Sequence, residues 1–550
     1  MKHGLRPIEL DVDGVVTKLR SMIESSQVDE ALGMVSTLLH SVVEESNSNV
    51  FRLIKALRNQ YGRKSEKVSP EQLMLALQEL SATMDLLAPI ELPPEPPRRQ
   101  KPKKKARPHG RRALPAHLPR EDEPVAVPEA ERTCEKCGTE KAVIGHEASE
   151  VLEYVPASFK VRRILREKRA CPKCGDGLVV APVGDKVIER GLPGAGMLAQ
   201  VLVDKYQDHL PLNRQAGRYE RLGYEIPRST LSDWVHAATD LLEPLWKVNR
   251  EAALVADVLQ ADGTHLKVLD REHPNNVKRG SLWCFVGDGK YVHFEYAPNE
   301  SREGPLSLLR AREGPLVVDA DTKLDSLFTA EDAKAYEVGC WMHGRRRFVE
   351  ALKGGELMAA YPLDLIRRMY AVEELAKGLG PDEVHALRQL HTRPVMDVLW
   401  KWMAEKGPEL RPSYPLAQAI GYAAKNRVAL TRFLDDGRLP IDNGASERAI
   451  RAVAVGRKNY LFAGSDAGGK RAAIAYSMLG SCALVGVNPW AYLQDVFEKL
   501  ARGWPKGKIF DLLPADWAED HPEHLLPKKD LPTPTDDAEE EPEPTPAEAD

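Results

Sequence analysis

The apolar residues of this chain recur with two different periods, and the change between them separates helical regions from a sheet-forming region. Across residues 14–85 and again across 195–245, apolar side chains return every three or four positions, which predicts amphipathic helices. From residue 255 the pattern changes to short apolar runs bounded by turn residues, which is typical of buried strands. Helical spacing returns across residues 345–435, so the sheet-forming region is interrupted by a helical insertion.

The sheet-forming region contains five apolar runs with the length of strands. They are Val258–Asp262, Leu282–Val286, Tyr291–Tyr296, Pro315–Asp319 and Tyr336–Trp341. The turn Gly287–Lys290 joins the second and third runs as a hairpin, and helices are expected near residues 303–312 and 326–334. The resulting order, β-β-β-α-β-α-β, is the layout of a ribonuclease-H-like fold, in which the first and fourth strands are neighbours.

Two of these runs end in an aspartate, Asp262 in the first and Asp319 in the fourth. Neighbouring strands would therefore bring two carboxylates together. Cleaving or exchanging a phosphodiester requires charge to be neutralised on the attacking and leaving oxygens, and two Mg²⁺ ions held by a few carboxylates do this. A third acid is expected from the helix that opens at 441–448, where Glu447 is the candidate and Asp442 competes with it.

That same helix carries polar residues at a regular spacing. Asn443, Glu447 and Arg451 recur every four positions, so one face presents an amide, a carboxylate and a cation.

Cysteine spacing predicts a zinc site. Seven cysteines, an odd number in a large chain, argue against a disulfide framework. Four of them form two pairs, each with two residues between the thiols: Cys134, Cys137, Cys171 and Cys174. Four such thiols suit tetrahedral zinc, and the strand-like segment 151–165 between the pairs can form a ribbon. The other three stand alone in apolar surroundings and are interpreted as core residues: Cys284, Cys340 and Cys482.

Composition and charge indicate where the protein is located and which kind of partner it can bind. The chain has 550 residues, 43% of them hydrophobic, without a predicted membrane span or secretory leader, so a cytoplasmic location is expected. Nine acids and no Lys or Arg lie in residues 530–550. Removing these nine from the formal net charge of −5 leaves +4 for residues 1–529, which permits a polyanionic partner.

Two segments before the sheet are candidates for DNA binding. Residues 88–125 are rich in proline and basic residues, including Lys103, Lys104 and Lys105; such a segment can lie along phosphates, and a merely soluble linker is the alternative. Within 195–245, Gly223 separates two short amphipathic pieces, and the second begins at Arg228. This pattern is compatible with a helix-turn-helix, although an ordinary helical hairpin fits it equally well.

Ordered blocks between about Tyr61 and Leu500 resemble transposases of the insertion-sequence sixty-six family. The blocks are GRKSEK (62–67), LPAHLPRE (114–121), the paired cysteines with VPASFKVRR (155–163), DKYQDHLPLNRQ (204–215), CWMHGRRRF (340–348), the IDN and SER pieces of 441–448, and GRKNYLFAGSDAGG (456–469). The resemblance implies a DDE transposase with a multidomain α+β architecture. A ribonuclease-H-like α/β catalytic core with a helical insertion would follow a zinc ribbon and helical DNA-binding segments.

The resemblance also implies roles for individual residues. Asp262, Asp319 and Glu447 match the catalytic triad that holds Mg²⁺, for which Mn²⁺ can substitute. The chain departs from the family's usual pattern beside each acid: Gly263 and Gly444 replace other residues, and Ala320-Asp321 stands where a Gly-Tyr pair is usual.

Several basic residues cluster near the expected acids and are predicted to contact phosphate, with a solvated surface as the alternative. They are Arg345, Arg346, Arg448, Arg451, Arg457 and Lys458. His343 and Asn443 are possible accessory groups, and a structural role for His343 is equally compatible with its position. Residues 464–470 have the spacing of a phosphate loop, but Arg471 follows where Ser or Thr would hold Mg²⁺, so ATP is not expected.

The sequence therefore predicts a DNA transposase that binds the ends of an insertion sequence and catalyses metal-dependent strand cleavage and strand transfer. A non-catalytic DNA-binding regulator or inactive copy is the alternative, and a metal-dependent nuclease is a third interpretation. Expected partners are DNA, further copies of the chain on DNA and, by resemblance, small accessory proteins; the expected location is the nucleoid. The predicted segments are 1–87 (helical), 88–125 (basic linker), 126–182 (zinc ribbon), 183–248 (helical), 249–344 (core), 345–435 (insertion), 436–512 (core with the glutamate helix) and 513–550 (disordered acidic tail).

Overall fold

The computed structural model describes residues 136, 139–140, 158–169, 179–181, 186–189 and 191–527. The predictions for residues 1–87, for the basic linker with Lys103–Lys105, for Cys134, Cys137, Cys171 and Cys174, and for the acidic tail after residue 527 lie outside the described residues. Contacts divide the chain into two units. The larger contains Asp185–Gln215 and the described residues from Pro227 onward, and the smaller contains the described residues before Gly184 together with Ala216–Ile226.

The smaller unit contains a short antiparallel pair of strands. Strand β1 (Lys168–Arg169) pairs with β2 (Val179–Val180), with Arg169 opposite Val179. In the same unit the ring of Phe159 lies 5.6 Å from that of Tyr219, measured between centroids.

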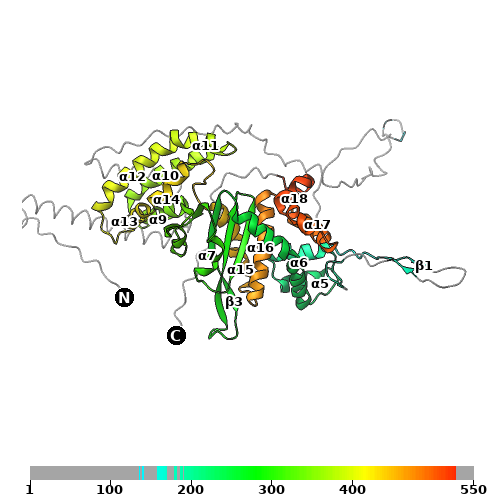
Figure 1. Ribbon diagram of the computed structural model, residues 1–550. Coiled ribbons are helices and arrows are strands. Elements are labelled where there is room, and N and C mark those ends of the chain that lie inside the picture. The colour runs from blue at the N-terminus through cyan, green and yellow to red at the C-terminus, as the bar shows by residue number, and fades with distance from the viewer. Residues whose placement is uncertain are drawn as a thin grey trace, which may run out of the picture. The chain divides into compact units, whose positions relative to one another are not determined.

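The larger unit is built around a mixed five-stranded sheet (Figure 1). Its strands are β3 (Leu259–Leu269), β4 (Val277–Gly287), β5 (Tyr291–Ala297), β6 (Gly314–Val318) and β7 (Ala335–Gly339). Their order across the sheet is β5-β4-β3-β6-β7, with β3, β4 and β5 antiparallel and with β6 and β7 parallel to β3. The predicted neighbourhood of the first and fourth strands is therefore confirmed.

The first strand is longer than its apolar run predicts. The sequence indicates an end at Asp262, but β3 continues to Leu269. Residues 263–269 stay extended because they pair with β4 on one side, while on the other side the amide of Leu269 donates to the carbonyl of Ala463. Both partners satisfy backbone groups that would otherwise be unpaired, so Asp262 lies within a strand rather than at its end.

The two faces of the sheet pack against different layers. On one face Leu259, Ala261, Leu316 and Val318 join Leu306 and Leu309 of helix α7 (Glu303–Leu309) in one core. On the other face Val258, Val317 and Val338 join the core of the helical insertion. Alternation of side chains along each strand produces this separation.

The remaining helices surround the sheet and form the insertion. Those around the sheet are α4 (Ala195–Leu202), α6 (Arg228–Leu254), α8 (Ser326–Thr329), α9 (Trp341–Lys353), α15 (Gly444–Tyr460), α16 (Asp466–Val485), α17 (Pro489–Ala501) and α18 (Pro514–Asp520). Helix α5 (Leu212–Arg221) is divided between the two units, with Ala216–Arg221 in the smaller one. The insertion contains α10 (Ala360–Ala376), α11 (Pro381–Leu387), α12 (Arg393–Lys406), α13 (Pro415–Lys425) and α14 (Arg427–Thr431). Among the described residues, no helix combines the length and apolar character needed to cross a membrane.

The predicted second short helix after Gly223 is instead the N-terminal part of α6, which has 27 residues. Buried Leu231, Val235 and Leu242 continue one apolar face along it, and this burial extends the helix beyond the short piece that the sequence indicates.

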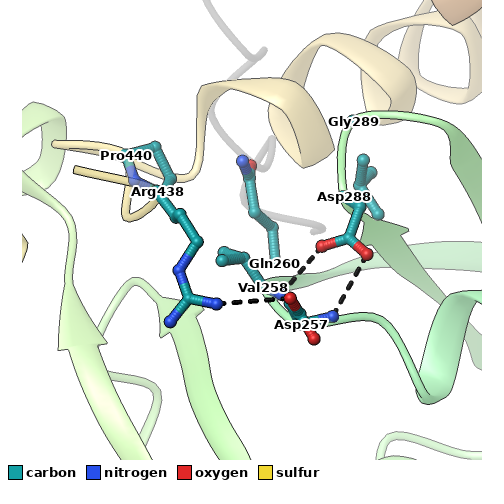
Figure 2. Close-up of a pocket in the computed structure, with 8 residues that line it drawn as sticks. Asp257, Val258, Gln260, Asp288, Gly289, Arg438 and Pro440 are labelled. Atoms are coloured by element: carbon teal, nitrogen blue, oxygen red, sulfur yellow. Dashed lines mark hydrogen bonds and ion pairs between the residues drawn. The ribbon is translucent and has the colours of Figure 1, made fainter. Parts of the chain in front are cut away.

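The insertion begins and ends at the same place on the sheet. The backbone amide of Trp341 donates to the carbonyl of Ile441 over 3.1 Å, although the two residues flank the whole insertion. Nearby, Arg438 forms an ion pair with Asp257 at 3.2 Å. Figure 2 shows this ion pair at a cavity of about 360 Å³ beside the start of β3, where the Asp288 carboxylate accepts the amides of Asp257 and Val258.

Helix α16 lies close against strand β5, and one glycine permits this approach. A Cβ atom on Gly469 would lie 2.6 Å from the ring of Tyr296, whose hydroxyl is fixed by a 2.6 Å hydrogen bond to Asp466. We expect Gly469→Ala to lower the free energy of unfolding by about 1–3 kcal/mol, because the ring cannot move without losing that bond. Urea unfolding followed by tryptophan fluorescence measures the change.

The adjacent glycine is a matched control. A Cβ on Gly468 would meet nothing closer than 3.7 Å, so Gly468→Ala should be neutral or stabilising by up to about 1 kcal/mol. Equal urea midpoints for the two variants would contradict the close approach.

Candidate active site

The register of the parallel strands places two aspartates side by side. Gln260 of β3 is opposite Val317 of β6. Asp262 comes two residues after Gln260, and Asp319 comes two residues after Val317. Because side chains alternate along a strand, each aspartate shares the face of the residue two positions before it. Val317 belongs to the core beneath the insertion, so both carboxylates are directed to that face of the sheet.

Helix α15 begins directly over these aspartates. The side-chain oxygen of Gln260 accepts the backbone amides of Ala445 at 3.1 Å and Ser446 at 3.3 Å. These amides belong to the first turn, where a helix has no acceptors of its own. Strand β3 therefore anchors the start of α15, and Glu447 follows in the same first turn, where the helix dipole favours a carboxylate.

The three acids influence one another electrostatically. Burial raises the pKa of Asp262 to about 7, and the neighbouring carboxylate of Asp319 contributes next, with a smaller effect from Glu447. A 2.7 Å hydrogen bond from the Gly263 amide opposes this rise. Carboxylate oxygens that repel one another in this way are suitable ligands for Mg²⁺ or Mn²⁺, because a divalent cation between them would remove the repulsion.

Asp442, the competing candidate for the third acid, has structural partners. Its carboxylate accepts the hydroxyl of Tyr370 at 2.7 Å and the amide of Gly444 at 3.0 Å. A Cβ on Gly444 would lie 2.7 Å from the same carboxylate, so the glycine permits this closure. Asp442 therefore holds the backbone at the start of α15 through the Gly444 amide, whereas Glu447 is close enough to Asp262 to raise its pKa.

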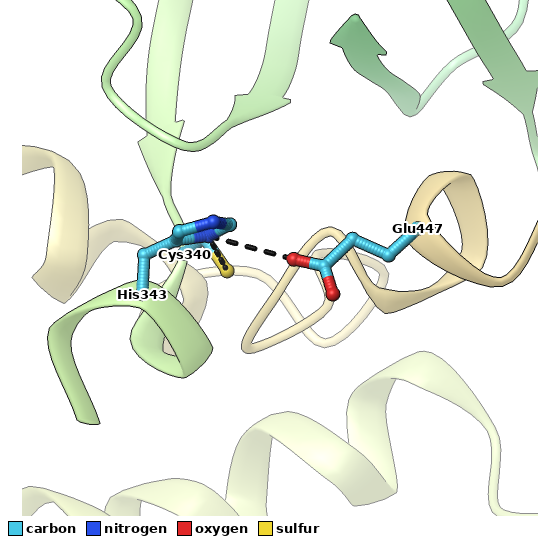
Figure 3. Close-up of side chains that lie close together, drawn as sticks. All are labelled: Cys340, His343 and Glu447. Atoms are coloured by element: carbon cyan, nitrogen blue, oxygen red, sulfur yellow. Dashed lines mark hydrogen bonds and ion pairs between the residues drawn. The ribbon is translucent and has the colours of Figure 1, made fainter. Parts of the chain in front are cut away.

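A cluster that the sequence did not predict lies beside Glu447. Among the described residues, Cys340, His343 and Glu447 form the one group of three potential metal-ligand side chains whose atoms all lie within 4.8 Å of one another. Figure 3 shows the three side chains close together, with dashed lines from the His343 ring to the other two: Nδ1 lies 3.4 Å from the Cys340 sulfur and 3.5 Å from Oε1 of Glu447.

Burial shapes the chemistry of this cluster. It raises the pKa of the Cys340 thiol to about 12 and lowers the pKa of His343, an effect that the carboxylate of Asp319 opposes. The sequence analysis assigned Cys340 to the core, and the residue is indeed buried. The missed signal was the spacing Cys-x-x-His at the start of α9, which places both side chains on one side of the first helical turn.

Asn443 is buried just before α15. Its carbonyl accepts the amide of Glu447 at 3.2 Å and the hydroxyl of Ser446 at 2.8 Å. Within the described part of the chain its side-chain amide has no hydrogen-bond partner. Its backbone therefore fixes the first turn of the glutamate helix.

The basic residues of α15 are of two kinds: three are exposed to solvent and one is hydrogen-bonded to strand β3. Arg448, Arg451 and Lys458 are exposed and, at spacings of three and seven, lie along one side of the helix. Arg457 instead donates to the hydroxyl of Thr264 at 2.8 Å and to the carbonyl of His265 at 2.9 Å. The exposed residues thus form a basic stripe that begins beside Glu447.

The other predicted basic residues lie on α9 and α6. Arg345 and Arg346 are partly buried on α9, where Arg346 lies near enough to His343 to lower the pKa of its imidazole. Arg347 is exposed and places its guanidinium 4.2 Å from the centroid of the Tyr422 ring. Arg228 is exposed in the first turn of α6.

The segment with phosphate-loop spacing is the start of α16. The hydroxyl of Ser465 accepts the amide of Gly468 at 3.1 Å, which caps the helix. Asp466 in the first turn bonds Tyr296 and forms an ion pair with Lys278 at 2.8 Å. The glycines of this segment therefore serve helix capping and contact with the sheet.

Comparison with known families matches four consecutive parts of the chain. Residues 190–471 match the family described as "Transposase IS66 family", which includes all three acids. The other matches are "Transposase C of IS166 homeodomain" at 51–122, "zinc-finger binding domain of transposase IS66" at 131–175, which spans both cysteine pairs, and "IS66 C-terminal element" at 477–515.

Similar curated proteins come from Sinorhizobium fredii (strain NBRC 101917 / NGR234). "Uncharacterized protein y4qI" is 30% identical over 537 residues, which cover 93% of this chain and 98% of the relative. "Uncharacterized protein y4hP" and "Uncharacterized protein y4jD" are each 30% identical; the matches cover 71% and 74% of this chain and 74% and 82% of the relatives, respectively.

The residue after Asp319 has a strained backbone. Ala320 has a φ of 65°, in the left-handed region that favours glycine. We expect Ala320→Gly to raise the free energy of unfolding by up to about 1 kcal/mol, because relief of about 1–2 kcal/mol of strain is partly offset by greater freedom in the unfolded chain. Ala320→Val should lower it, because β-branching worsens the clash. Urea unfolding of both variants tests this, and the reverse order of stabilities would refute it.

Proposed function

Because the chain belongs to the IS66 family of transposases, we propose that it cuts DNA at the ends of an insertion sequence and joins the freed 3′-hydroxyl to target DNA with the help of Mg²⁺. The observation that carries this proposal is the placement of Asp262 beside Asp319 under the first turn of α15, which carries Glu447. Three acids held on rigid elements are the ligand set that two-metal phosphoryl transfer requires.

The architecture supports the same proposal. We interpret the sheet as a ribonuclease-H-like core, since three antiparallel strands are followed by two strands parallel to the first, in the order β5-β4-β3-β6-β7. The helical insertion interrupts this core between α9 and α15. In this arrangement Asp262 lies within β3, Asp319 directly follows the neighbouring strand β6, and the third acid comes from a helix whose first turn is bonded to the Gln260 side chain of β3.

The side chains of the site would divide the work. Asp262, Asp319 and Glu447 would hold divalent cations, which when bound neutralise the attacking and leaving oxygens and activate water or a 3′-hydroxyl. Gln260 would keep Glu447 in place through the first-turn amides of α15. The basic stripe of Arg448, Arg451 and Lys458 would bind phosphates of the DNA strand that approaches the acids.

DNA recognition is proposed to involve segments before the core. The match to the zinc-finger family covers Cys134, Cys137, Cys171 and Cys174, which we propose hold one structural Zn²⁺. In the described residues, β1 and β2 precede and follow the second pair of cysteines in the sequence. Lys103, Lys104 and Lys105 would add phosphate contacts without base selectivity. Assembly of several copies on DNA and the help of accessory proteins are part of the same proposal.

The triad is tested by replacing each acid with its amide. We expect Asp262→Asn, Asp319→Asn and Glu447→Gln each to lower Mg²⁺-dependent cleavage of a labelled element-end duplex at least about a hundredfold, because each loses a charged metal ligand. Binding of the duplex, measured by gel shift, should persist because the proposed recognition segments lie outside the triad.

Asp442→Asn is the matched control for Glu447→Gln. It should retain cleavage at temperatures where it is folded, because an amide oxygen can still accept the Gly444 amide. An inactive Asp442→Asn together with a fully active Glu447→Gln would show that the third ligand is misassigned. Full activity in all three triad variants would show that these acids are not the metal ligands. An unmodified protein that binds the duplex but does not cleave it would favour a non-catalytic DNA-binding function.

The basic stripe gives a separate prediction about salt dependence. Replacing Arg451 and Lys458 together by Ala should remove two phosphate contacts and reduce the slope of log affinity against log salt by about 1.8. Fluorescence anisotropy with element-end DNA at several salt concentrations measures this slope.

Arg310→Ala is the control for the stripe. Arg310 is exposed at the end of α7, which packs on the opposite face of the sheet. Its replacement by Ala should therefore leave the slope of log affinity against log salt unchanged. A loss of about 0.9 in this single-charge control, the same loss per charge as in the double variant, would mean that the stripe contributes only general charge.

A further inference from the structure

The cluster of Cys340, His343 and Glu447 has the shape of a site for a tetrahedral cation. With bonds of about 2.3 Å to sulfur and about 2.0–2.1 Å to nitrogen or oxygen, tetrahedral zinc separates its ligand atoms by about 3.3–3.6 Å. The Nδ1 atom of His343 lies 3.4 Å from the Cys340 sulfur and 3.5 Å from Oε1 of Glu447. Two edges of the coordination polyhedron are therefore already at the required length, as Figure 3 shows.

The elements that carry the cluster hold it in place and leave it accessible. Cys340 is fully buried between β7 and α9, and His343 follows within the first turn of α9. The His343 and Glu447 side chains keep 24% and 26% of their surface exposed, although the Oε1 atom of Glu447 that faces the imidazole is buried. We infer that a cation would enter from this partly exposed side and complete its coordination with water. Three ligands with one open position are a common zinc arrangement.

We propose that Cys340, His343 and Glu447 form a binding site for Zn²⁺ that is separate from the Mg²⁺ ligands Asp262 and Asp319 but shares Glu447 with them. Binding releases the thiol proton of Cys340 to solvent and leaves a thiolate on the metal. Thiolate and imidazole select Zn²⁺ over Mg²⁺, which prefers oxygen ligands. The effect on catalysis rests on the proposed function, since Glu447 cannot complete both sites at once and Zn²⁺ is expected to inhibit cleavage.

The first test counts metal ions and needs no catalysis. Co²⁺ is titrated into the full-length protein, and the visible and thiolate charge-transfer absorption bands are followed. We expect two cobalt ions per chain with the strong absorption of tetrahedral thiolate sites, one at the four paired cysteines and one at this cluster; cobalt on carboxylates alone absorbs weakly and has no thiolate band. Cys340→Ser and His343→Asn should each remove one equivalent, and Cys340→Ser should also remove about one fifth of the thiolate absorption, one thiolate of five.

Cys482→Ser is the matched control, because Cys482 is an equally buried thiol on α16 outside the cluster. It should bind cobalt as the unmodified protein does. Unchanged cobalt binding in both Cys340→Ser and His343→Asn would overturn the proposal and leave a hydrogen-bonded cluster. Because the two variants change different residues, misfolding of one variant cannot be mistaken for loss of the cobalt ion in both.

The second test measures inhibition. Zn²⁺ should suppress Mg²⁺-dependent cleavage, and in Cys340→Ser the Zn²⁺ concentration for half inhibition, relative to that variant's own uninhibited rate, should rise at least about tenfold. If cobalt binding responds to the variants but no cleavage is seen with Mg²⁺, the proposed function fails while the zinc site stands. If cleavage occurs and the variants leave cobalt binding unchanged, the zinc site alone fails.

Discussion

Asp262, Asp319 and Glu447 carry like charges, and the surrounding structure has to hold them together against their repulsion. At a strand separation of about 4.8 Å and an effective dielectric constant of about 20, two carboxylates repel by about 3 kcal/mol. This is a large share of the 5–15 kcal/mol that usually stabilises a domain. Burial raises the pKa of Asp262 to about 7, and repulsion from the neighbouring carboxylate of Asp319 is the next largest cause.

The fold resists this repulsion with backbone hydrogen bonds. The parallel register of β3 and β6 fixes the two aspartates, and the side chain of Gln260 fixes the start of α15 to the same strand. Asp442 closes the helix start from the other side by accepting the Gly444 amide, while Tyr370 of the insertion holds that carboxylate. The insertion therefore contributes to the position of Glu447, although the residues it supplies are far from the acids in sequence.

Much of this arrangement could be predicted from the sequence, because it follows from local patterns. Short apolar runs gave the strand order, and an acid at the end of two runs identified Asp262 and Asp319. The choice between Asp442 and Glu447 could not be made in this way, since it depends on Tyr370, 72 positions before Asp442. The extent of β3 was missed for the same reason, because Ala463 pairs with its far half. Burial of Cys340 was anticipated, but its proximity to Glu447 depends on contacts between distant segments.

The hydrogen bond between Trp341 and Ile441 has a consequence for how this protein can change in evolution. The two ends of the insertion meet, so its length can vary without moving the strands on either side. The insertion nevertheless shares its core with the sheet through Val317 and Val338, and complete removal would expose these side chains to water. Tolerated growth or shortening is therefore confined to the parts of the insertion that do not contact the sheet, while the part that joins the sheet must keep its size. Relatives of different length should accordingly differ at the tip of the insertion and agree where it joins the sheet.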